Sequence, residues 1–363
     1  MHPRRPRLTP AIADVRRGVR ASLAVVGEGR LVLVALSGGP DSLALAAATA
    51  FEAPRAGLRA GAIVIDHGLQ EGSADVAAQA ARQASELGLD PVVVRRVEVA
   101  SGGGPEAAAR AARYAGLAAV AAELAASAVL LGHTLDDQAE TVLLGLARGS
   151  GPRSLAGMAP RAELPPATAE GRQIHAPGGH EGEFGVPHDA IALVRPLLGL
   201  RRTTTVQACA DAGLEPWDDP HNTDAAYSRV RVRHDVLPVL ERELGPGVAE
   251  ALARTAEQLR EDADALDTFA LEQIEELAEP AEAGLSLPVA ALAANPPALR
   301  HRLIRLAVAA EFGRSLSRAH TLEIARLVDD WHGQDALHLP GVRVERTGGR
   351  IHFSAAGHEG DEE

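Results

Sequence analysis

Short apolar segments recur along the first half of the chain, and stretches with helical periodicity separate them. Residues 31–36, 61–65, 91–94 and 128–131 are apolar without interruption, which is the pattern of strands buried on both faces. Successive segments begin about 30 residues apart, the length of a strand–helix–strand unit. This alternation predicts an α/β fold with a doubly wound, mostly parallel sheet, covered by helices on both faces. The helices are expected at 11–29, from about 43, at 73–88, at 105–126 and from about 134.

Helical patterns dominate the second half of the chain. One long helix, or two, is expected over 245–279, because an apolar line runs through it and Pro280 ends it. Two more helices, at 296–312 and 316–330, precede a strand pair that turns at Thr347-Gly348-Gly349. The C-terminal part is therefore expected to be a helical region followed by a small α+β unit.

The segment at 160–190 is rich in proline and glycine and has no period, so we expect a long surface loop there. A short strand is expected after it, at 192–194. These features divide the chain into four parts, namely 1–218, 219–280, 281–356 and a disordered tail at 357–363.

Composition is that of a soluble globular protein. The 363 residues are 46% hydrophobic and 23% charged, and only 2% are aromatic, so Ala, Leu and Val must build the core. No apolar run reaches the roughly 20 residues that cross a membrane, and no signal-peptide stretch follows the basic N-terminus. Cys209 is the only cysteine, which excludes an intrachain disulfide and a cysteine-based zinc cluster. We expect a cytoplasmic protein without membrane contact.

Charge narrows the possible chemistry. All 36 basic residues are arginine, so a lysine Schiff base and a Walker-type phosphate loop are both excluded. The net charge of −13 argues against general affinity for nucleic acid. Any binding of RNA must therefore come from local basic patches.

One turn carries the strongest local signal. Ser37-Gly38-Gly39-Pro40-Asp41-Ser42 lies between a buried strand and an Ala-rich helix. Glycines let the backbone approach an anion closely, and N–H groups at a helix N-terminus present positive potential to it. A carboxylate beside phosphates, here Asp41, suits a Mg²⁺ ion. A tight turn with a capping serine is the alternative, but it accounts for one Ser and one Gly rather than for the whole motif.

A second polar cluster follows the fourth strand. On a helix, His133, Asp137 and Glu140 share one face, because they are spaced by four and three positions. Thr134 and Asp137 fit a capping box as well, and the whole set could hold a divalent metal. Capping leaves His133, Asp136 and Glu140 unexplained. We therefore prefer a paired-carboxylate pocket for a cationic substrate group, with His133 near phosphate.

Further candidates come from the preceding helix and the second strand. Glu106, Arg110, Arg113 and Tyr114 lie along one helix face. Glu106 and Arg110 fit a surface ion pair, whereas Arg113 is better placed to bind a carboxylate in a bidentate manner. Asp66 ends the second strand, either near the nucleotide or in an ordinary turn. Arginine for a carboxylate and Asp/Glu for an amine are what a pocket for a free amino acid needs.

Taken in order, these motifs resemble those of the tRNA(Ile)-lysidine synthetases, a family of the PP-loop (N-type ATP pyrophosphatase) superfamily. The resemblance covers about residues 30–355 and rests on Ser37–Ser42, Asp66–Gly68, Ala109–Tyr114, His133–Thr141, Arg148–Gly151, Gly157-Met158, Arg195–Leu198, Asp219–Asp224, Tyr227, Arg229–Arg233 and Leu237-Pro238. Two features depart from the family pattern. Val230 stands where the family usually has Asn, and the 160–190 segment is longer than usual.

The resemblance implies the reaction. The wobble cytidine of a CAU-anticodon tRNA(Ile) attacks the α-phosphate of ATP through its C2 oxygen, and pyrophosphate leaves. Free L-lysine then attacks C2 through its ε-amine and displaces AMP. The product, lysidine, pairs with A rather than G and changes the tRNA from methionine to isoleucine identity. ATP and Mg²⁺ are the implied cofactors, and a homodimer is left open.

The resemblance also implies residue roles. ATP is expected on Ser37, Gly38, Gly39, Pro40, Asp41, Ser42 and Asp66, with Mg²⁺ on Asp41. The expected catalytic residues are Asp41, His133, Asp137 and Glu140. Asp137 and Glu140 would orient the lysine amine, and Arg113 would hold the lysine carboxylate. The lysine amine, with a reference pKa of about 10.4, must lose a proton before it can attack.

For the tRNA, the implied contacts are Arg195, Arg201, Arg202, Arg229, Arg231 and Arg233, with Trp217 and Tyr227 available for stacking. Arginines at alternate positions fit a solvated edge equally well. In this scheme 1–218 is the ATP pyrophosphatase domain, 219–280 contacts tRNA, and 281–356 is a substrate-binding domain.

Rival functions remain at this point. A tRNA cytidine thiolase would need cysteines that this chain lacks. NAD or GMP synthetase-like ligases share the loop but not the Asn222–Arg233 region. A non-catalytic nucleotide- or RNA-binding module would release no pyrophosphate from ATP.

Overall fold

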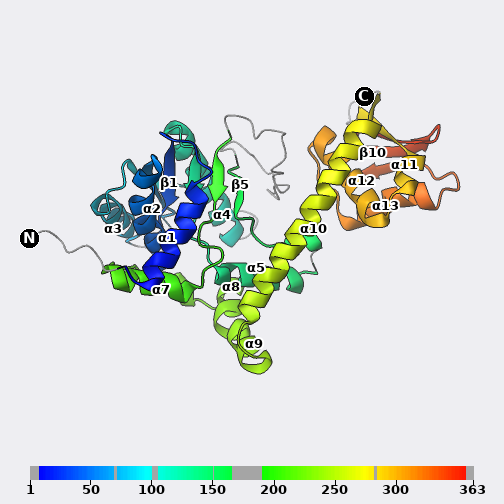
Figure 1. The fold of residues 1–363 in the computed structure, drawn as a ribbon. Helices are drawn as coiled ribbons and strands as arrows, with labels where there is room; N and C mark the ends of the chain where they lie inside the picture. The colour runs from blue at the N-terminus through cyan, green and yellow to red at the C-terminus, as the bar shows by residue number, and fades with distance from the viewer. Residues whose placement is uncertain are drawn as a thin grey trace, which may run out of the picture. The chain divides into compact units, whose positions relative to one another are not determined.

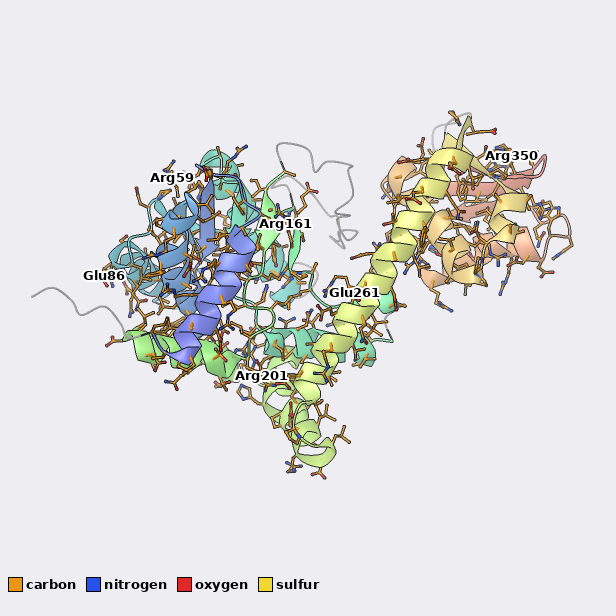
Figure 2. All side chains as sticks on the ribbon, viewed as in Figure 1. Arg59, Glu86, Arg161, Arg201, Glu261 and Arg350 are labelled. Atoms are coloured by element: carbon orange, nitrogen blue, oxygen red, sulfur yellow. The ribbon has the colours of Figure 1, made fainter. Side chains whose placement is uncertain are left out.

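The computed structural model describes residues 8–68, 72–99, 105–149, 151–165, 190–281 and 284–356, without the side chains of residues 105, 106 and 221. Two compact units divide it, Met1–Arg260 and Glu261–Glu363. Glu261 lies on the long helix α10 (Val248–Leu277), which therefore begins in the first unit and ends in the second (Figure 2). The expected boundaries at 218 and 280 lie on either side of this division and stay predictions. The tail at 357–363 and most of the 160–190 segment lie outside the described residues.

The first unit contains a six-stranded sheet in the order β3-β2-β1-β4-β6-β5. All neighbours pair in parallel except β5, which is antiparallel to β6. This confirms the predicted mostly parallel α/β sheet, shown in Figure 1. The strands are β1 (Leu31–Ala35), β2 (Arg59–Asp66), β3 (Val92–Arg96), β4 (Ala128–Leu130), β5 (Arg161–Glu163) and β6 (Ala192–Val194).

Strand β5 corrects one expectation. Its residues fall inside the 160–190 segment, whose composition predicts a loop over its whole length. The strand is too short to show alternation in the sequence, and it forms because Arg161 pairs with Val194 and Glu163 with Ala192 at the sheet edge. Pairing with a distant strand, which the local sequence does not record, decides this element.

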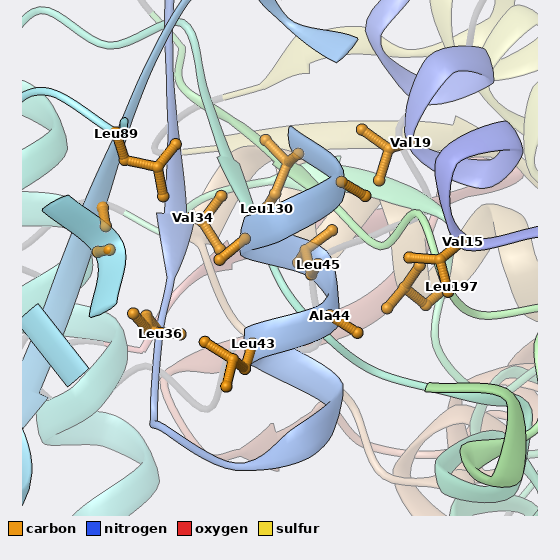
Figure 3. Close-up of a cluster of buried hydrophobic side chains, with 14 of the residues drawn as sticks. Val15, Val19, Val34, Leu36, Leu43, Ala44, Leu45, Leu89, Leu130 and Leu197 are labelled. Carbon is orange, nitrogen blue, oxygen red and sulfur yellow. The ribbon is translucent and has the colours of Figure 1, made fainter. Parts of the chain in front are cut away.

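Helices cover both faces of the sheet, as predicted. Val32 and Val34 point to one face, where they pack with α1 (Pro10–Leu23), α2 (Pro40–Glu52), α3 (Ser73–Glu86) and α7 (Arg202–Ala212). The alternate residues Leu31 and Leu33 point to the other face, against α4 (Pro105–Glu123). Figure 3 shows the first of these two cores, in which Leu43 and Leu45 of α2 lie beside Val34.

Local sequence explains where the helices begin and end. Thr9 caps α1, because its hydroxyl accepts a hydrogen bond from the Ile12 N–H, and Pro10 is preset for the first helical position. The helix ends at Leu23 rather than 29, ahead of Gly29 at φ +74°. Helix α2 begins at Pro40, three residues earlier than expected, for the same reason that proline favours a helix start.

The chain between the last strand of the sheet and α10 is mostly short helices. These elements and those after β4 are α5 (Leu135–Ala147), α6 (Pro152–Leu155), the 3₁₀ turn η2 (Pro220–Thr223), α8 (Ser228–Arg231), the π-helix η3 (Val232–Val236) and α9 (Leu237–Leu244). Another 3₁₀ turn, η1 (Pro54–Ala56), lies between α2 and β2. Within the described residues, no helix is long and apolar enough to cross a membrane.

The second unit is a small α+β structure, as predicted. Its antiparallel sheet has the order β7-β8-β11-β10-β9, with strands Glu279–Ala281, Gly284–Pro288, Arg350–Ala355, Val342–Thr347 and Leu337–Leu339. Helices α11 (Val289–Ala294), α12 (Pro297–Phe312) and α13 (Arg318–Asp329) share its core with Phe353 and Leu287. The sequence predicted the hairpin of β10 and β11 but not the short strands β7 and β8. Pro280, which we expected to end the long helix, lies inside β7, and α10 ends before it at Leu277.

Candidate active site

The middle of the first sheet is the point where its strand order changes direction. From β1 the chain crosses to β2 on one side, whereas β4 pairs with the opposite edge of β1 and leads on to β6. Ligands of open α/β sheets bind beyond the carboxyl ends of the strands at such a point. The Ser37–Ser42 loop follows β1, and the His133–Glu140 segment follows β4. Both predicted clusters therefore meet here.

Gly132 lets the two clusters approach each other. A Cβ atom at this position would lie 3.0 Å from the Asp41 carbonyl and from the Ser42 nitrogen. Any side chain at 132 would therefore press against the backbone of the loop. This close approach joins the end of β4 to the start of α2.

The loop is held in shape by its own serines. The Ser42 hydroxyl accepts from the Ser37 N–H at 3.2 Å and donates to the Gly39 carbonyl at 3.0 Å. Gly38 has φ +85°, which only glycine adopts without strain, and its carbonyl accepts a 2.9 Å hydrogen bond from the Trp217 N–H. The first turn of α2 then leaves N–H groups without helical acceptors, which is the arrangement that binds phosphate.

Asp41 leans away from the loop toward α7. One carboxylate oxygen accepts from Arg202 Nε at 3.0 Å, and the other accepts from the Thr205 hydroxyl. Burial raises the pKa of Asp41, although Arg202 and Thr205 act in the opposite direction. The carboxylate at the loop therefore has two partners from the same helix N-terminus.

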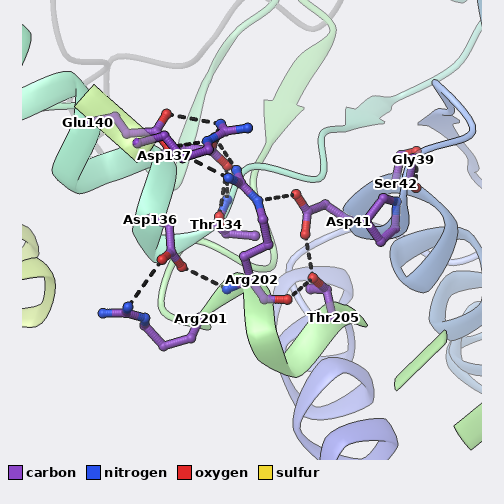
Figure 4. A network of polar contacts seen from close by, with 12 residues as sticks. Gly39, Asp41, Ser42, Thr134, Asp136, Asp137, Glu140, Arg201, Arg202 and Thr205 are labelled. Carbon is purple, nitrogen blue, oxygen red and sulfur yellow. Dashed lines mark hydrogen bonds and ion pairs between the residues drawn. The ribbon is translucent and has the colours of Figure 1, made fainter. Parts of the chain in front are cut away.

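Asp137 and Glu140 form ion pairs with arginines, so they are not the free carboxylates that the sequence suggested (Figure 4). Asp137 accepts from the Thr134 N–H and hydroxyl, both at 2.8 Å, and from Arg202 Nη2 at 2.7 Å. Burial opposes its ionisation, but Arg202 and the Thr134 hydrogen bonds outweigh burial and lower the pKa of Asp137 to about 2. Glu140 is fully buried, and Arg233 binds both of its oxygens at 2.7 and 3.1 Å. The proposed capping contacts of Asp137 thus exist together with its ion pairs.

Arg202 connects the two predicted clusters. Its guanidinium bonds Asp41 and Asp137 and lies 3.6 Å from Glu140. Its backbone N–H also donates to Asp136 at 2.7 Å. One arginine at the start of α7 therefore spans the nucleotide loop and the carboxylate pair.

His133 lies among a second group of arginines, Arg110, Arg113 and Arg195. Arg195 Nε donates to His133 Nδ1 at 3.3 Å, and Arg110 and Arg113 lie over the Tyr114 ring at 5.0 and 5.4 Å. Burial, followed by the charges of these arginines, holds the pKa of His133 well below its usual value despite the nearby Asp137 carboxylate. The predicted His133 and Arg113 are therefore neighbours.

Comparison with known proteins identifies these segments. Residues 15–240 match a PP-loop domain model, and residues 287–352 match a TilS substrate binding domain model. The tRNA(Ile)-lysidine synthase of Leifsonia xyli is 63% identical over 329 residues, which cover 90% of this chain and 91% of the relative. That of Thermobifida fusca is 51% identical and covers 95% of this chain and 98% of the relative.

The chain belongs to the tRNA(Ile)-lysidine synthase family. The predicted resemblance is thereby confirmed, and so is the use of ATP by a PP-loop ligase. A U34-tRNA thiolase from Methanococcus maripaludis shares the fold, with a TM-score of 0.53 over 69% of this chain and 80% of the thiolase. At 21% identity this likeness concerns the fold alone.

The structure brings together, at the carboxyl ends of β1 and β4, most of the residues predicted to form the site of a lysidine synthase. Ser37–Ser42, Asp41, His133, Asp137 and Glu140 meet there. Asp66 lies at the end of the neighbouring strand β2, where its carboxylate accepts from the Gly68 N–H at 2.9 Å. The Gly68 and Ser73 hydrogen bonds and Arg96 lower the pKa of Asp66, although burial acts against them. Its predicted contact with nucleotide stays a prediction.

The arginines predicted to contact tRNA have protein partners in this structure. Arg202 and Arg233 bind the carboxylate pair, and Arg229 lies 3.9 Å from Glu140. Arg201 pairs with Asp136 at 3.3 Å and Glu250 at 3.1 Å, and Arg231 donates to the Ala225 and Ala226 carbonyls. Arg195 is 8% exposed. Their role in binding tRNA is a proposal rather than a finding.

Sequence reasoning missed several residues that shape the site. Thr205 and the backbone of Trp217 hold the loop, and Gln138 bonds both the N–H and the carbonyl of Met158 at 2.7 and 3.0 Å. Gly157 next to it has φ +62°, and a Cβ there would meet the Gln138 side chain at 2.5 Å. The Gly157-Met158 pair belongs to the family pattern, and its link to Gln138 gives it a physical reason. No sequence signal pointed to Thr205.

Proposed function

We propose that this chain ligates free L-lysine to C2 of the wobble cytidine in a CAU-anticodon tRNA(Ile), with an adenylated cytidine as the intermediate. In the first step the cytidine O2 bonds to the α-phosphorus of ATP and pyrophosphate leaves. In the second, the deprotonated ε-amine bonds to C2 and AMP leaves. The observation that supports this most directly is the meeting of the Ser37–Ser42 loop with Asp137 and Glu140 at one edge of the sheet.

The loop is suited to hold the triphosphate. Two glycines, the free N–H groups of α2 and the Ser37 hydroxyl surround the place where phosphate would bind. Mg²⁺ fits if Asp41 supplies a protein ligand, because Mg²⁺ commonly takes one or two carboxylates and fills its shell with phosphate oxygens and water. The described residues contain no group of three or more side chains that could hold a metal without such help. When bound, Mg²⁺ offsets the negative charge that builds on the leaving pyrophosphate.

The lysine would bind beside Glu140. A hollow of about 240 Å³ adjoins this residue, with Asp136 and Glu241 as acidic and Arg201 and Arg233 as basic lining groups. Asp137 and Glu140 would orient the ammonium group, and one of them would take its proton. Arg113 would hold the lysine carboxylate. For the ammonium group to reach Asp137 and Glu140, the arginines now on them must give up some of their hydrogen bonds.

A direct assay tests the function. The protein would be incubated with ATP, labelled lysine and transcripts of the CAU-anticodon tRNA(Ile) or of methionine tRNA. We expect label in the isoleucine transcript, pyrophosphate release that depends on tRNA, and repeated turnover only when lysine is present. Pyrophosphate release without incorporation of lysine, or equal labelling of both transcripts, would contradict the proposal.

A further inference from the structure

The hydrogen bond between Arg195 and His133 determines which form of the imidazole is present. A guanidinium group has only donors, so the 3.3 Å contact from Arg195 Nε requires that His133 Nδ1 accept with its lone pair. A neutral imidazole with an unprotonated Nδ1 carries its proton on Nε2. His133 therefore presents an N–H donor at Nε2.

Arg195 is fixed so that it cannot easily release this ring. Its Nη1 donates to the Ala159 carbonyl at 2.7 Å, and its side chain also hydrogen-bonds the buried Tyr114. The Arg195 N–H donates to the Pro160 carbonyl at 2.8 Å, and the residue is 8% exposed. Arg195 Nε and Nη1 are thus both engaged within the protein.

The charges around His133 favour the neutral ring. Arg110 and Arg113 of α4 and Arg195 after β6 face it, and Asp137 of α5 is the acidic group that opposes them. Proton uptake would place a further positive charge among three guanidinium groups. None of the described residues accepts a hydrogen bond from Nε2, so this donor is available to a ligand.

We infer that His133 acts as a fixed, neutral Nε2–H donor to an oxygen of the nucleotide's phosphate chain, and that Arg195 is the positioning residue that sets this tautomer. Gly132, the residue before His133, contacts the backbone of the Ser37–Ser42 loop, which places the ring next to the phosphate site. The inference rests on the proposed function, in which that loop binds ATP. It gives His133, which we expected to lie near phosphate, a defined hydrogen-bonding role there, and it removes Arg195 from the proposed tRNA contacts.

Two substitutions at position 133 separate these roles. The amide NH₂ of His133→Gln reaches the place of Nε2, whereas that of His133→Asn reaches only the place of Nδ1. We expect tRNA-dependent pyrophosphate release to stay within about tenfold of wild type in the glutamine variant, and to fall by roughly 10²–10³-fold in the asparagine variant, the usual loss of one preorganised donor. Equal loss in both variants, with correct folding by circular dichroism, would overturn the inference.

A readout that does not depend on activity concerns Arg195. In ¹⁵N-labelled protein, the imidazole signals that disappear in His133→Gln belong to His133 and report its tautomer. We expect the Nε2–H form in wild type and in Arg195→Lys, and a mixture of tautomers in Arg195→Met. The opposite tautomer in wild type, or no change in Arg195→Met, contradicts the inference even if the enzyme makes lysidine. Correct tautomers in an inactive enzyme would instead contradict the proposed function.

Discussion

The site contains two groups of arginines, and they differ in what balances their charge. In the first group, Arg202, Arg229 and Arg233 lie against Asp41, Asp137 and Glu140, so three positive charges meet three negative ones. In the second group, Arg110, Arg113 and Arg195 lie near Tyr114 and His133, and no carboxylate among the described side chains forms an ion pair with them.

The difference teaches that one residue type has two physical roles in this site. A paired guanidinium fixes the elements that carry its partners, because breaking a buried pair leaves an uncompensated charge. Arginines without a carboxylate partner create a positive potential that attracts an anion. This potential lowers the pKa of Tyr114, because it favours the negative phenolate, and that of His133, because it disfavours the positive imidazolium. The first group is therefore expected to govern stability and the second to govern binding.

The largest effect is expected from Arg202→Met, because this side chain joins Asp41 to Asp137. Both carboxylates would lose a charged partner in a partly buried place, so the free energy of unfolding should fall by roughly 3 kcal/mol. Pyrophosphate release should fall by more than about 10³-fold, since the loop and α5 lose their common anchor. Urea denaturation and the tRNA-dependent assay measure the two effects.

A double variant and a neighbour serve as controls for Arg202. Adding Asp137→Asn to Arg202→Met should restore part of the lost stability, because one orphaned charge disappears. Arg201→Met, which breaks pairs with the more exposed Asp136 and Glu250, should cost less than about 1 kcal/mol. If Arg202→Met were as stable as wild type, the paired group would not have the structural role that we assign to it.

Arg113→Gln should produce a smaller effect, and it should act on lysine binding rather than on stability. Removing one of several like charges should leave stability unchanged, whereas the KM for lysine should rise roughly 10–100-fold through loss of a charged hydrogen bond. Lysinamide, which has no carboxylate, distinguishes the cause. Its KM should be the same in wild type and in the variant, as judged by lysidine formation.

Arg110→Gln is the matched control, because Arg110 is more exposed than Arg113 and donates to the Tyr114 hydroxyl at 3.3 Å. A rise in KM for lysine and lysinamide alike in Arg113→Gln would mean that Arg113 does not bind the carboxylate. The anion that the second group attracts would then have to be a phosphate.

The comparison also indicates what the sequence could and could not predict. The Ser37–Ser42 loop and the His133–Glu140 face were predictable, because in each a local motif at a strand end fixes both the structure and its chemistry. The partners of Arg202 were not, since they depend on contacts 65 and 161 positions away along the chain. Nothing in a residue's neighbours reports such contacts.

The arginines of the 229–233 segment show a different limit. Their alternate spacing suggests one exposed edge if the segment is extended, as in a strand. The segment is helical instead, so Arg229 and Arg233 turn toward Glu140 while Arg231 remains exposed. Packing of Val232 and Leu237 against α5 holds the helical backbone that decides where these arginines point.

The smallest effect is expected from the pH dependence of the paired group. Asp137 has a pKa of about 2 in the folded protein, below its reference value of 3.8, so its pairing stabilises the fold above pH 4 and loses this contribution as the pH falls toward 2. Asp137→Asn should therefore lower the free energy of unfolding by no more than about 2 kcal/mol at pH 7. The deficit should stay constant between pH 8 and about pH 5 and shrink only below about pH 4, where the unfolded carboxyl takes up its proton. Urea denaturation of both proteins at several pH values measures the deficit, and Glu123→Gln, on an exposed pair with Arg95, should show almost none. A deficit that grows as the pH falls from 5 to 4 would mean that Asp137 ionises with difficulty in the fold, and the charge balance that separates the two arginine groups would be wrong.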